Sequence, residues 1–148
     1  MKREILQTLD GSTTIHLPDW NESYHSKHGA IQEAYHVFIQ NGLLTFNNQP
    51  ISILEIDFGT GRNAFISYIE SKKSNQKIDY YGVEAYPISA NEILQMNFVS
   101  ELNAAAESEV FKRMHECDWE IINQISPLFS LTKRKQFVEQ IDDEDKFD

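Results

Sequence analysis

The sequence is poor in cysteine and has no long apolar run. Cys117 is its only cysteine, so no disulfide bond can form within the chain. No apolar stretch reaches the roughly 18 to 20 residues that a membrane span needs, and the first residues lack the apolar segment of a signal peptide. These absences exclude a disulfide scaffold, and they predict a globular protein of the cytoplasm.

Positive charge is also scarce. The chain has 13 Lys and Arg against 23 Asp and Glu, a formal net charge of −10. This balance argues against strong non-specific binding to nucleic acids, which requires cationic side chains to neutralise phosphates. The last ten residues hold six acidic residues and only Lys146, so half of the net charge lies in this acidic tail. The remainder is less acidic, and 41% apolar residues in 148 are enough for one domain with a core.

The predicted elements follow the order of an α/β protein. Asp10-Gly11 is a strong turn signal, and the apolar residues after Gly29 recur at the three- and four-residue steps of an amphipathic helix. The predicted elements are a hairpin at 9–17, a helix at 29–42, a strand at 51–56, a helix at 62–72, a strand at 78–83 and a helix at 87–102. The β-α-β-α order implies a parallel sheet with helices packed on it.

The pattern is weaker after Leu102. We predict a helix over 107–114 and a second short helix over 119–125. The segment 128–138 is compatible with two strands that pair around a turn at Lys133-Arg134-Lys135. This basic turn is either solvated or in contact with RNA phosphates, and the sequence leaves both open.

A glycine-containing loop is the strongest local signal. It reads Glu55-Ile56-Asp57-Phe58-Gly59-Thr60-Gly61-Arg62-Asn63-Ala64 and lies between a predicted strand and a predicted helix. Glycines let a backbone approach a ligand closely, and a helix N-terminus offers free N–H groups. Glu84 follows 23 residues after Gly61, at the end of the next strand. A carboxylate there can accept hydrogen bonds from both ribose hydroxyls of an adenosine cofactor.

Three interpretations of this loop compete. Gly59, Gly61 and Ala64 satisfy the dinucleotide fingerprint G-x-G-x-x-(G/A), and Glu84 has about the expected spacing. Glu55 inside the strand and the Gly-Thr-Gly after it favour instead the E-x-G-x-G-x-G signature of methyltransferases. The loop alone therefore leaves open S-adenosylmethionine, a dinucleotide of the NAD type and a merely structural turn.

Two further blocks make the match more specific. The N-terminal block consists of Asp10-Gly11-Ser12-Thr13, Tyr24-His25-Ser26, His28-Gly29-Ala30, Glu33-Ala34 and His36-Val37-Phe38. It resembles the N-terminal block of the MnmC/MnmD-type tRNA methyltransferases. The segment from Ile53 to Asn63 and the segment Val83-Glu84-Ala85-Tyr86-Pro87 resemble the next two blocks of that family, in the same order. Together the three blocks cover most of residues 8–90.

The resemblance implies a Rossmann-like class I methyltransferase fold with S-adenosylmethionine as methyl donor. The implied reaction converts 5-aminomethyl-2-thiouridine to 5-methylaminomethyl-2-thiouridine at the tRNA wobble position, which makes tRNA the implied substrate. A neutral amine attacks an activated sulfonium in line, and a nearby carboxylate would orient the amine and accept its proton. The implied cofactor-binding residues are Tyr24, Ser26, Glu33, Glu55, Asp57, Gly59, Gly61, Asn63 and Glu84.

A cluster of histidines on the predicted N-terminal helix raises the question of a metal. His25, His28, Glu33 and His36 lie close together in the sequence. The spacing His28-x4-Glu33-x2-His36 fits no strong zinc pattern, and the resembling family uses no metal. We therefore expect no metal site.

The sequence departs from the family in its loop. Asp57 replaces the first glycine of E-x-G-x-G-x-G, and Arg62 stands where the family usually has leucine. The Asp57 carboxylate either faces a positive group of the cofactor or obstructs the pocket. A pairing between Arg62 and Asp57 is left open.

The second departure concerns the C-terminus. The family continues with a Phe-Asp-apolar-apolar-apolar-Asp-Ala-Phe-x-Pro strand whose inner aspartate belongs to the active site, whereas this chain ends at Lys146-Phe147-Asp148. We therefore expect a single domain over 1–148, truncated after the first strands, with the catalytic acid beyond Asp148. Residues 1–48 would form an N-terminal hairpin and helix extension, and 49–148 the first half of the methyltransferase unit.

A sheet cut at this point would expose apolar surface and a strand edge. Such an edge favours self-association or pairing with a partner. Two alternatives to a methyltransferase therefore stay open. One is a non-catalytic interaction module that keeps half of the fold, and the other is a dinucleotide-dependent oxidoreductase.

Overall fold

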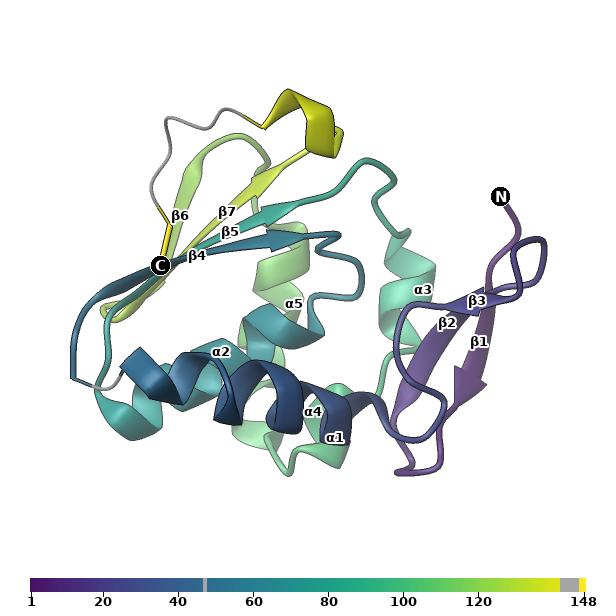
Figure 1. Cartoon of the computed structure of the whole chain (residues 1–148), viewed down its shortest axis with the longest axis horizontal. Helices are drawn as coiled ribbons and strands as arrows, with labels where there is room; N and C mark the ends of the chain where they lie inside the picture. Colours follow the sequence, from purple (N-terminus) through teal and green to yellow (C-terminus); the bar gives the residue numbers. More distant parts are fainter. Residues whose placement is uncertain (47, 142–146) are drawn as a thin grey trace.

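The computed structural model describes residues 1–46, 48–141 and 147–148, so most of the acidic tail lies outside the described residues. It contains two sheets (Figure 1). The small antiparallel sheet consists of β1 (Glu4–Gln7), β2 (Thr13–Leu17) and β3 (Glu22–Ser23). The larger sheet has the order β4 (Ile51–Ile56), β5 (Ile78–Val83), β7 (Phe129–Arg134) and β6 (Ile122–Ser126).

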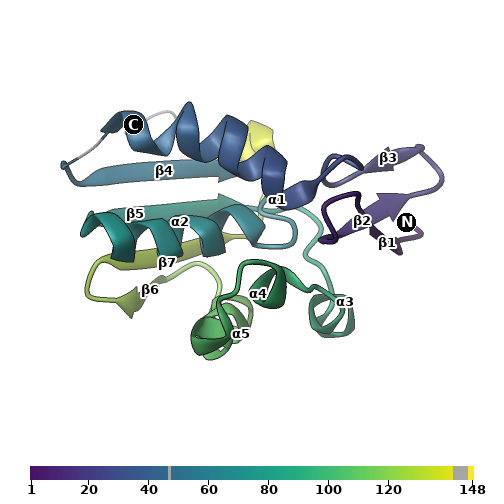
Figure 2. The ribbon, with the colours of Figure 1, turned by 90° about the horizontal axis from the view of Figure 1, so that it is seen from below.

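The helices lie mainly on one side of the larger sheet. They are α1 (Ala30–Glu33), the π-helix η1 (Ala34–Gln40), α2 (Arg62–Ser74), α3 (Ala90–Leu94), α4 (Phe98–Glu101) and α5 (Ser108–Glu116), with short 3-10 turns at Leu43–Phe46, Ala105–Glu107 and Val138–Gln140. Figures 1 and 2 show α1, α2 and α5 on the same face of the sheet. Within the described part, no helix is long and apolar enough to cross a membrane.

The parallel core of the sheet confirms the predicted β-α-β arrangement. β4 and β5 have the predicted bounds and pair in parallel, with Ile53 opposite Tyr80, and β5 pairs in parallel with β7. The hairpin around Asp10-Gly11 is also confirmed, since β1 and β2 pair antiparallel. These pairings bring the carboxyl ends of β4 and β5 to one edge, where parallel sheets bind their ligands.

Side chains of β5 alternate between the two faces of the sheet. Tyr80 is fully buried on the helical face, where its ring stacks on Phe129 at 5.8 Å and Tyr68 of α2 meets Phe129 edge-on. Tyr81 points to the opposite face, where its ring lies 5.2 Å from that of Phe147. The aromatic core therefore lies between the sheet and its helices.

The predicted helix at 87–102 is wrong in its extent, because it is interrupted. Ser89 caps α3 in a reciprocal pair with Glu92, and α4 starts again after Asn97. The Asn97 side chain leaves the helical pattern to bind the N-terminal hairpin: it accepts from the Thr13 N–H at 2.8 Å and donates to the Gly11 carbonyl at 2.9 Å. A contact between residues distant in sequence thus lies at the break between α3 and α4. The predicted helix at 29–42 is helical, but most of it is the π-helix η1.

The predictions for 119–125 and 128–138 are also wrong. The first segment contains β6 rather than a helix, and the second contains the single strand β7 rather than two strands around a basic turn. Lys133 lies inside β7 and is 1% exposed, so it is neither solvated nor free to contact RNA. Its ammonium group donates to the His115 carbonyl at 2.7 Å and lies 4.8 Å from the Trp119 ring. These two partners offset the cost of burying a charge.

Candidate functional site

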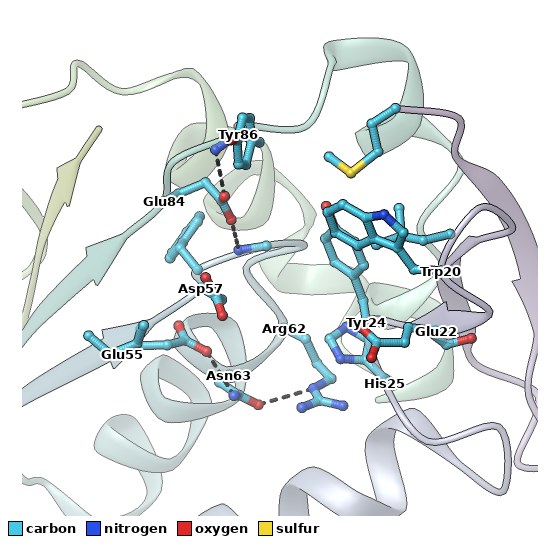
Figure 3. Close-up of a pocket in the computed structure, with 16 residues that line it drawn as sticks. Trp20, Glu22, Tyr24, His25, Glu55, Asp57, Arg62, Asn63, Glu84 and Tyr86 are labelled. Carbon is cyan, nitrogen blue, oxygen red and sulfur yellow. Dashed lines mark hydrogen bonds between the residues drawn. The ribbon is translucent and has the colours of Figure 1, made fainter. Parts of the chain in front are cut away.

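A pocket of about 500 Å³ lies where the carboxyl ends of β4 and β5 meet the small N-terminal sheet (Figure 3). The first wall belongs to the larger sheet and its glycine loop, and the second wall belongs to the N-terminal segment. The first wall consists of Glu55, Ile56, Asp57, Phe58, Gly59, Arg62, Asn63, Glu84 and Tyr86. The second wall consists of Met1, Leu17, Trp20, Glu22, Ser23, Tyr24 and His25.

The glycine loop has a left-handed backbone at three positions. The φ angles of Asp57, Gly59 and Gly61 are 63°, 53° and 70°, and Gly61 is the residue that precedes α2. A side chain at Gly59 would place its Cβ 3.2 Å from the ring of Tyr24. Glycine at this position therefore allows the aromatic ring of the second wall to lie against the loop.

Glu84 holds the loop and the end of β5 together. Its carboxylate accepts hydrogen bonds from the Gly59 N–H at 2.9 Å and from the Tyr86 N–H at 2.8 Å, and the residue is 6% exposed. Each carboxylate oxygen accepts one of these bonds, so each keeps capacity for a further donor. The group is thus fixed at the pocket wall with acceptors to spare.

Glu55 lies below the loop in a partly buried hydrogen-bond network. It accepts from the Tyr80 hydroxyl and from the Asn63 amide, both at 2.8 Å. Burial raises the pKa of Glu55 to about 7, because the charged form loses its hydration. Its charge therefore changes near neutral pH, and its hydrogen bonds orient Asn63 at the pocket wall.

Arg62 connects the loop to the N-terminal helix rather than to Asp57. Its guanidinium donates to the Ala30 carbonyl at 2.6 Å and to the Asn63 side chain at 3.0 Å, and lies 3.6 Å from the Glu33 carboxylate. Glu33 also accepts from the Ser26 N–H at 3.0 Å. The cationic group is thus already engaged by the protein.

Two neutral histidines hold Thr60 in the loop. His25 shares a 2.8 Å hydrogen bond with the Thr60 hydroxyl, and His115 of α5 lies 3.1 Å from the Thr60 carbonyl. Burial lowers the pKa of His25 to about 3 and that of His115 to about 4. Both imidazoles are therefore uncharged at neutral pH. Their hydrogen bonds connect the loop to the N-terminal segment on one side and to α5 on the other.

The other histidines of the predicted cluster do not converge. His28 and His36 are exposed, whereas His25 is directed at Thr60. Across residues 1–46, 48–141 and 147–148, no group of three or more His, Cys, Asp or Glu side chains is placed to hold a metal ion.

The pocket brings together most of the residues that the sequence pointed to. Tyr24, Glu55, Asp57, Gly59, Asn63 and Glu84 line it, whereas Gly61, Ser26 and Glu33 are not among its lining residues. Sequence reasoning missed Trp20 and Glu22, because they reach the site only through the packing of the N-terminal sheet. A tryptophan beside the turn signal Pro18-Asp19 was the one available hint.

The electrostatics of the pocket suit a positively charged ligand. Four carboxyl side chains line it, those of Glu22, Glu55, Asp57 and Glu84, against the one basic side chain of Arg62. Since Arg62 already faces the Ala30 carbonyl and Glu33, it contributes little free positive charge. An anionic ligand would be repelled by the carboxylates of Glu22, Asp57 and Glu84, and by Glu55 when it is ionised.

Comparison with known proteins gives a sequence relative and a structural one, while no family model matches the chain. The sequence is 30% identical, over 98 residues and 62% of the chain, to the tRNA 5-methylaminomethyl-2-thiouridine biosynthesis bifunctional protein MnmC of Acidovorax sp. (strain JS42). The solved structure of MNMC2 from Aquifex aeolicus matches 96% of the chain with a TM-score of 0.72 at 20% identity. The sequence match supports an MnmC-type family, and the structural match shows a shared fold.

The MnmC-type likeness confirms the predicted Rossmann-like α/β fold. The chain nevertheless spans less than half of the length of these MnmC-type proteins. The match covers 15% of the bifunctional protein and 46% of the solved chain.

Proposed function

We propose that this chain binds S-adenosylmethionine as part of a methyltransferase that acts on tRNA. The observation that carries the proposal is the carboxylate-rich pocket at the ends of β4 and β5. S-adenosylmethionine carries a sulfonium and an ammonium group, and it supplies a methyl group activated by the positive sulfur. The sequence similarity to MnmC supports the same choice.

A dinucleotide fits this pocket less well. The pyrophosphate of NAD needs free N–H groups at the helix N-terminus and has two negative charges. In this loop the Gly59 N–H is donated to Glu84, and the Gly61 N–H is donated to the Phe58 carbonyl at 3.0 Å. The surrounding carboxylates would add repulsion.

Residue roles follow from the positions of the side chains. The spare acceptors of Glu84 would take hydrogen bonds from the ribose hydroxyls, as carboxylates do at the end of the second strand of such folds. Asp57 faces the pocket below Glu84 (Figure 3), where its carboxylate would meet a positive group of the cofactor. Asn63 is oriented by Glu55 and would offer a polar contact to the cofactor. The Tyr24 ring of the second wall packs against the loop at Gly59.

The substrate that the proposal names is tRNA carrying 5-aminomethyl-2-thiouridine at the wobble position, and a cytoplasmic location accords with it. Transfer forms an N–C bond as the C–S bond breaks, and the amine proton passes to a carboxylate or to water.

The test is to incubate the 148-residue chain with methyl-labelled S-adenosylmethionine and undermodified tRNA. Label in the tRNA supports a methyltransferase. Transfer by the chain alone would refute the non-catalytic module, and failure to bind S-adenosylmethionine would refute the proposal.

Asp57→Gly should change the affinity for S-adenosylmethionine while it leaves the stability of the fold nearly unchanged. The left-handed φ of 63° is strained for aspartate but ordinary for glycine, whereas glycine increases the entropy of the unfolded chain. Because these effects oppose each other, we expect the free energy of unfolding to change by less than about 1 kcal/mol. Loss of the carboxylate should weaken S-adenosylmethionine binding about tenfold, since a hydrogen bond to a charged group contributes about 1.5 kcal/mol or more.

Calorimetry and thermal melts of Asp57→Gly and Asp57→Asn check this expectation. Asp57→Asn keeps the shape of the side chain and removes its charge, so it should lose a similar factor in affinity. Tighter binding of the cofactor by Asp57→Gly would show that the aspartate obstructs the pocket.

We also propose that the outer edge of β4 supports self-association. β4 is an edge strand, and the backbone of Ser52 faces outward, where it exchanges hydrogen bonds with Asp148 at 2.9 and 2.8 Å. By strand alternation the N–H of Leu54 points the same way. Strand edges with outward-facing N–H and C=O groups can pair with further strands.

Sedimentation should therefore show a concentration-dependent dimer. Leu54→Pro should remove this dimer, because proline has no backbone N–H to donate. A wild-type monomer at all concentrations would contradict the proposal.

A further inference from the structure

Trp20 is the largest aromatic side chain at the pocket and is left mostly in water. It is 62% exposed and lies two residues after Pro18 in the turn between β2 and β3. Its backbone N–H donates to the Leu17 carbonyl at 3.1 Å. Among the described residues, no ring contact involves its indole. The turn thus presents a flat apolar side chain of which the described residues leave the larger part uncovered.

The indole lies across the pocket from the proposed cofactor wall. Figure 3 shows Trp20 and Tyr24 on the side opposite Glu84 and Asp57. If the ribose lies at Glu84, the second wall is left for the other reactant. That wall comes from the N-terminal sheet and not from the Rossmann-like unit.

We propose that Trp20 is the platform on which the base of the acceptor nucleotide stacks, an inference that rests on the proposed function. A base splayed out of a single-stranded RNA loop is bound by stacking on an aromatic side chain. A base on Trp20 directs its amine substituent toward the carboxylates of the opposite wall. The pocket thereby selects a base that carries a basic amine.

The charge of the chain makes stacking more important than phosphate contacts. With a formal net charge of −10, the protein has few cations to neutralise an RNA backbone. Recognition of the base should therefore dominate, and the affinity should depend only weakly on salt concentration.

The test is a binding titration with the 148-residue chain and a labelled single-stranded RNA heptamer whose central residue is 5-aminomethyl-2-thiouridine. Trp20→Ala should weaken binding about tenfold or more, in the range found when a stacking aromatic is truncated. Trp20→Phe should recover most of the loss. Leu9→Ala is the matched control, because Leu9 is an exposed apolar residue in the β1–β2 turn, outside the pocket lining.

A second heptamer with an abasic centre identifies the contact. On this RNA, Trp20→Ala and the wild type should bind equally, since no base is present to stack. Equal binding of the modified heptamer by Trp20→Ala and wild type, or no binding by the wild type, would overturn the inference. The titration contains no cofactor, so failure of the proposed function appears separately, as absence of S-adenosylmethionine binding by the wild type.

Discussion

Glu84→Ala should bind S-adenosylmethionine about 100-fold more weakly than the wild type. Each ribose hydroxyl that donates to the carboxylate contributes about 1.5 kcal/mol, so loss of two such bonds removes about 3 kcal/mol. The substitution also leaves the buried N–H groups of Gly59 and Tyr86 without their acceptor. We therefore expect a further cost of about 1–3 kcal/mol in the free energy of unfolding. Calorimetry measures the first effect and chemical denaturation the second.

The ribose contact can be separated from the support of the loop. A cofactor analogue without the two ribose hydroxyls should bind the wild type about as weakly as Glu84→Ala binds S-adenosylmethionine. For Glu84→Ala itself, the analogue and the natural cofactor should then have similar affinities. Glu109→Ala on the exposed side of α5 serves as the carboxylate control. An undiminished preference of Glu84→Ala for the natural cofactor would exclude Glu84 as the ribose acceptor.

Acid should destabilise the fold through the two histidines at Thr60. His25 and His115 have folded pKa values of about 3 and about 4, below their ordinary value of 6.5, so the unfolded chain binds more protons below pH 6.5. Stability is therefore lost as the pH falls below 6.5, by about 3 kcal/mol for the two residues together between pH 6.5 and pH 5. Denaturation curves between pH 4 and pH 8 measure this loss.

Glu55 opposes the effect of the histidines. Its folded pKa of about 7 lies above its ordinary value of 4.5, so the folded chain binds more protons between these values and stability falls as the pH rises. From pH 6.5 to pH 5 the protonation of Glu55 adds about 1.7 kcal/mol to the free energy of unfolding, which leaves a net loss of about 1.5 kcal/mol. Glu55→Gln should make the acid loss steeper, and His115→Gln should make it shallower. His28→Gln, at an exposed position, should leave the profile unchanged; a flat wild-type profile would refute the buried neutral imidazoles.

The first half of the larger sheet was predictable because its signals are local. β4 is a short apolar run followed by glycines, and β5 is followed directly by the acidic residue Glu84, so both strands have the predicted bounds. The bounds of β7 depend instead on pairing with β5, about fifty residues away, and on partners that bury Lys133. No local pattern reveals that a run of three basic residues begins inside a strand.

The same distinction applies to the pocket. Spacing alone placed Glu84 near the glycine loop, because the ends of parallel strands meet at one edge. The second wall arises from packing between the N-terminal sheet and the loop, through His25 on Thr60 and the Tyr24 ring on Gly59. These contacts join residues that are 35 positions apart in the sequence, and their periodicity gives no sign of them. Gly82 also makes a close contact that its local sequence does not reveal, since a Cβ at this position would lie 2.3 Å from the Phe58 ring.

We propose above all that the pocket at the ends of β4 and β5 recognises a positively charged sulfonium cofactor. The most direct measurement is a calorimetric titration of the wild-type chain with S-adenosylmethionine and, separately, with NAD. We expect one binding site for S-adenosylmethionine, with no measurable heat from NAD at the same concentrations. Binding of NAD without binding of S-adenosylmethionine would contradict the proposal.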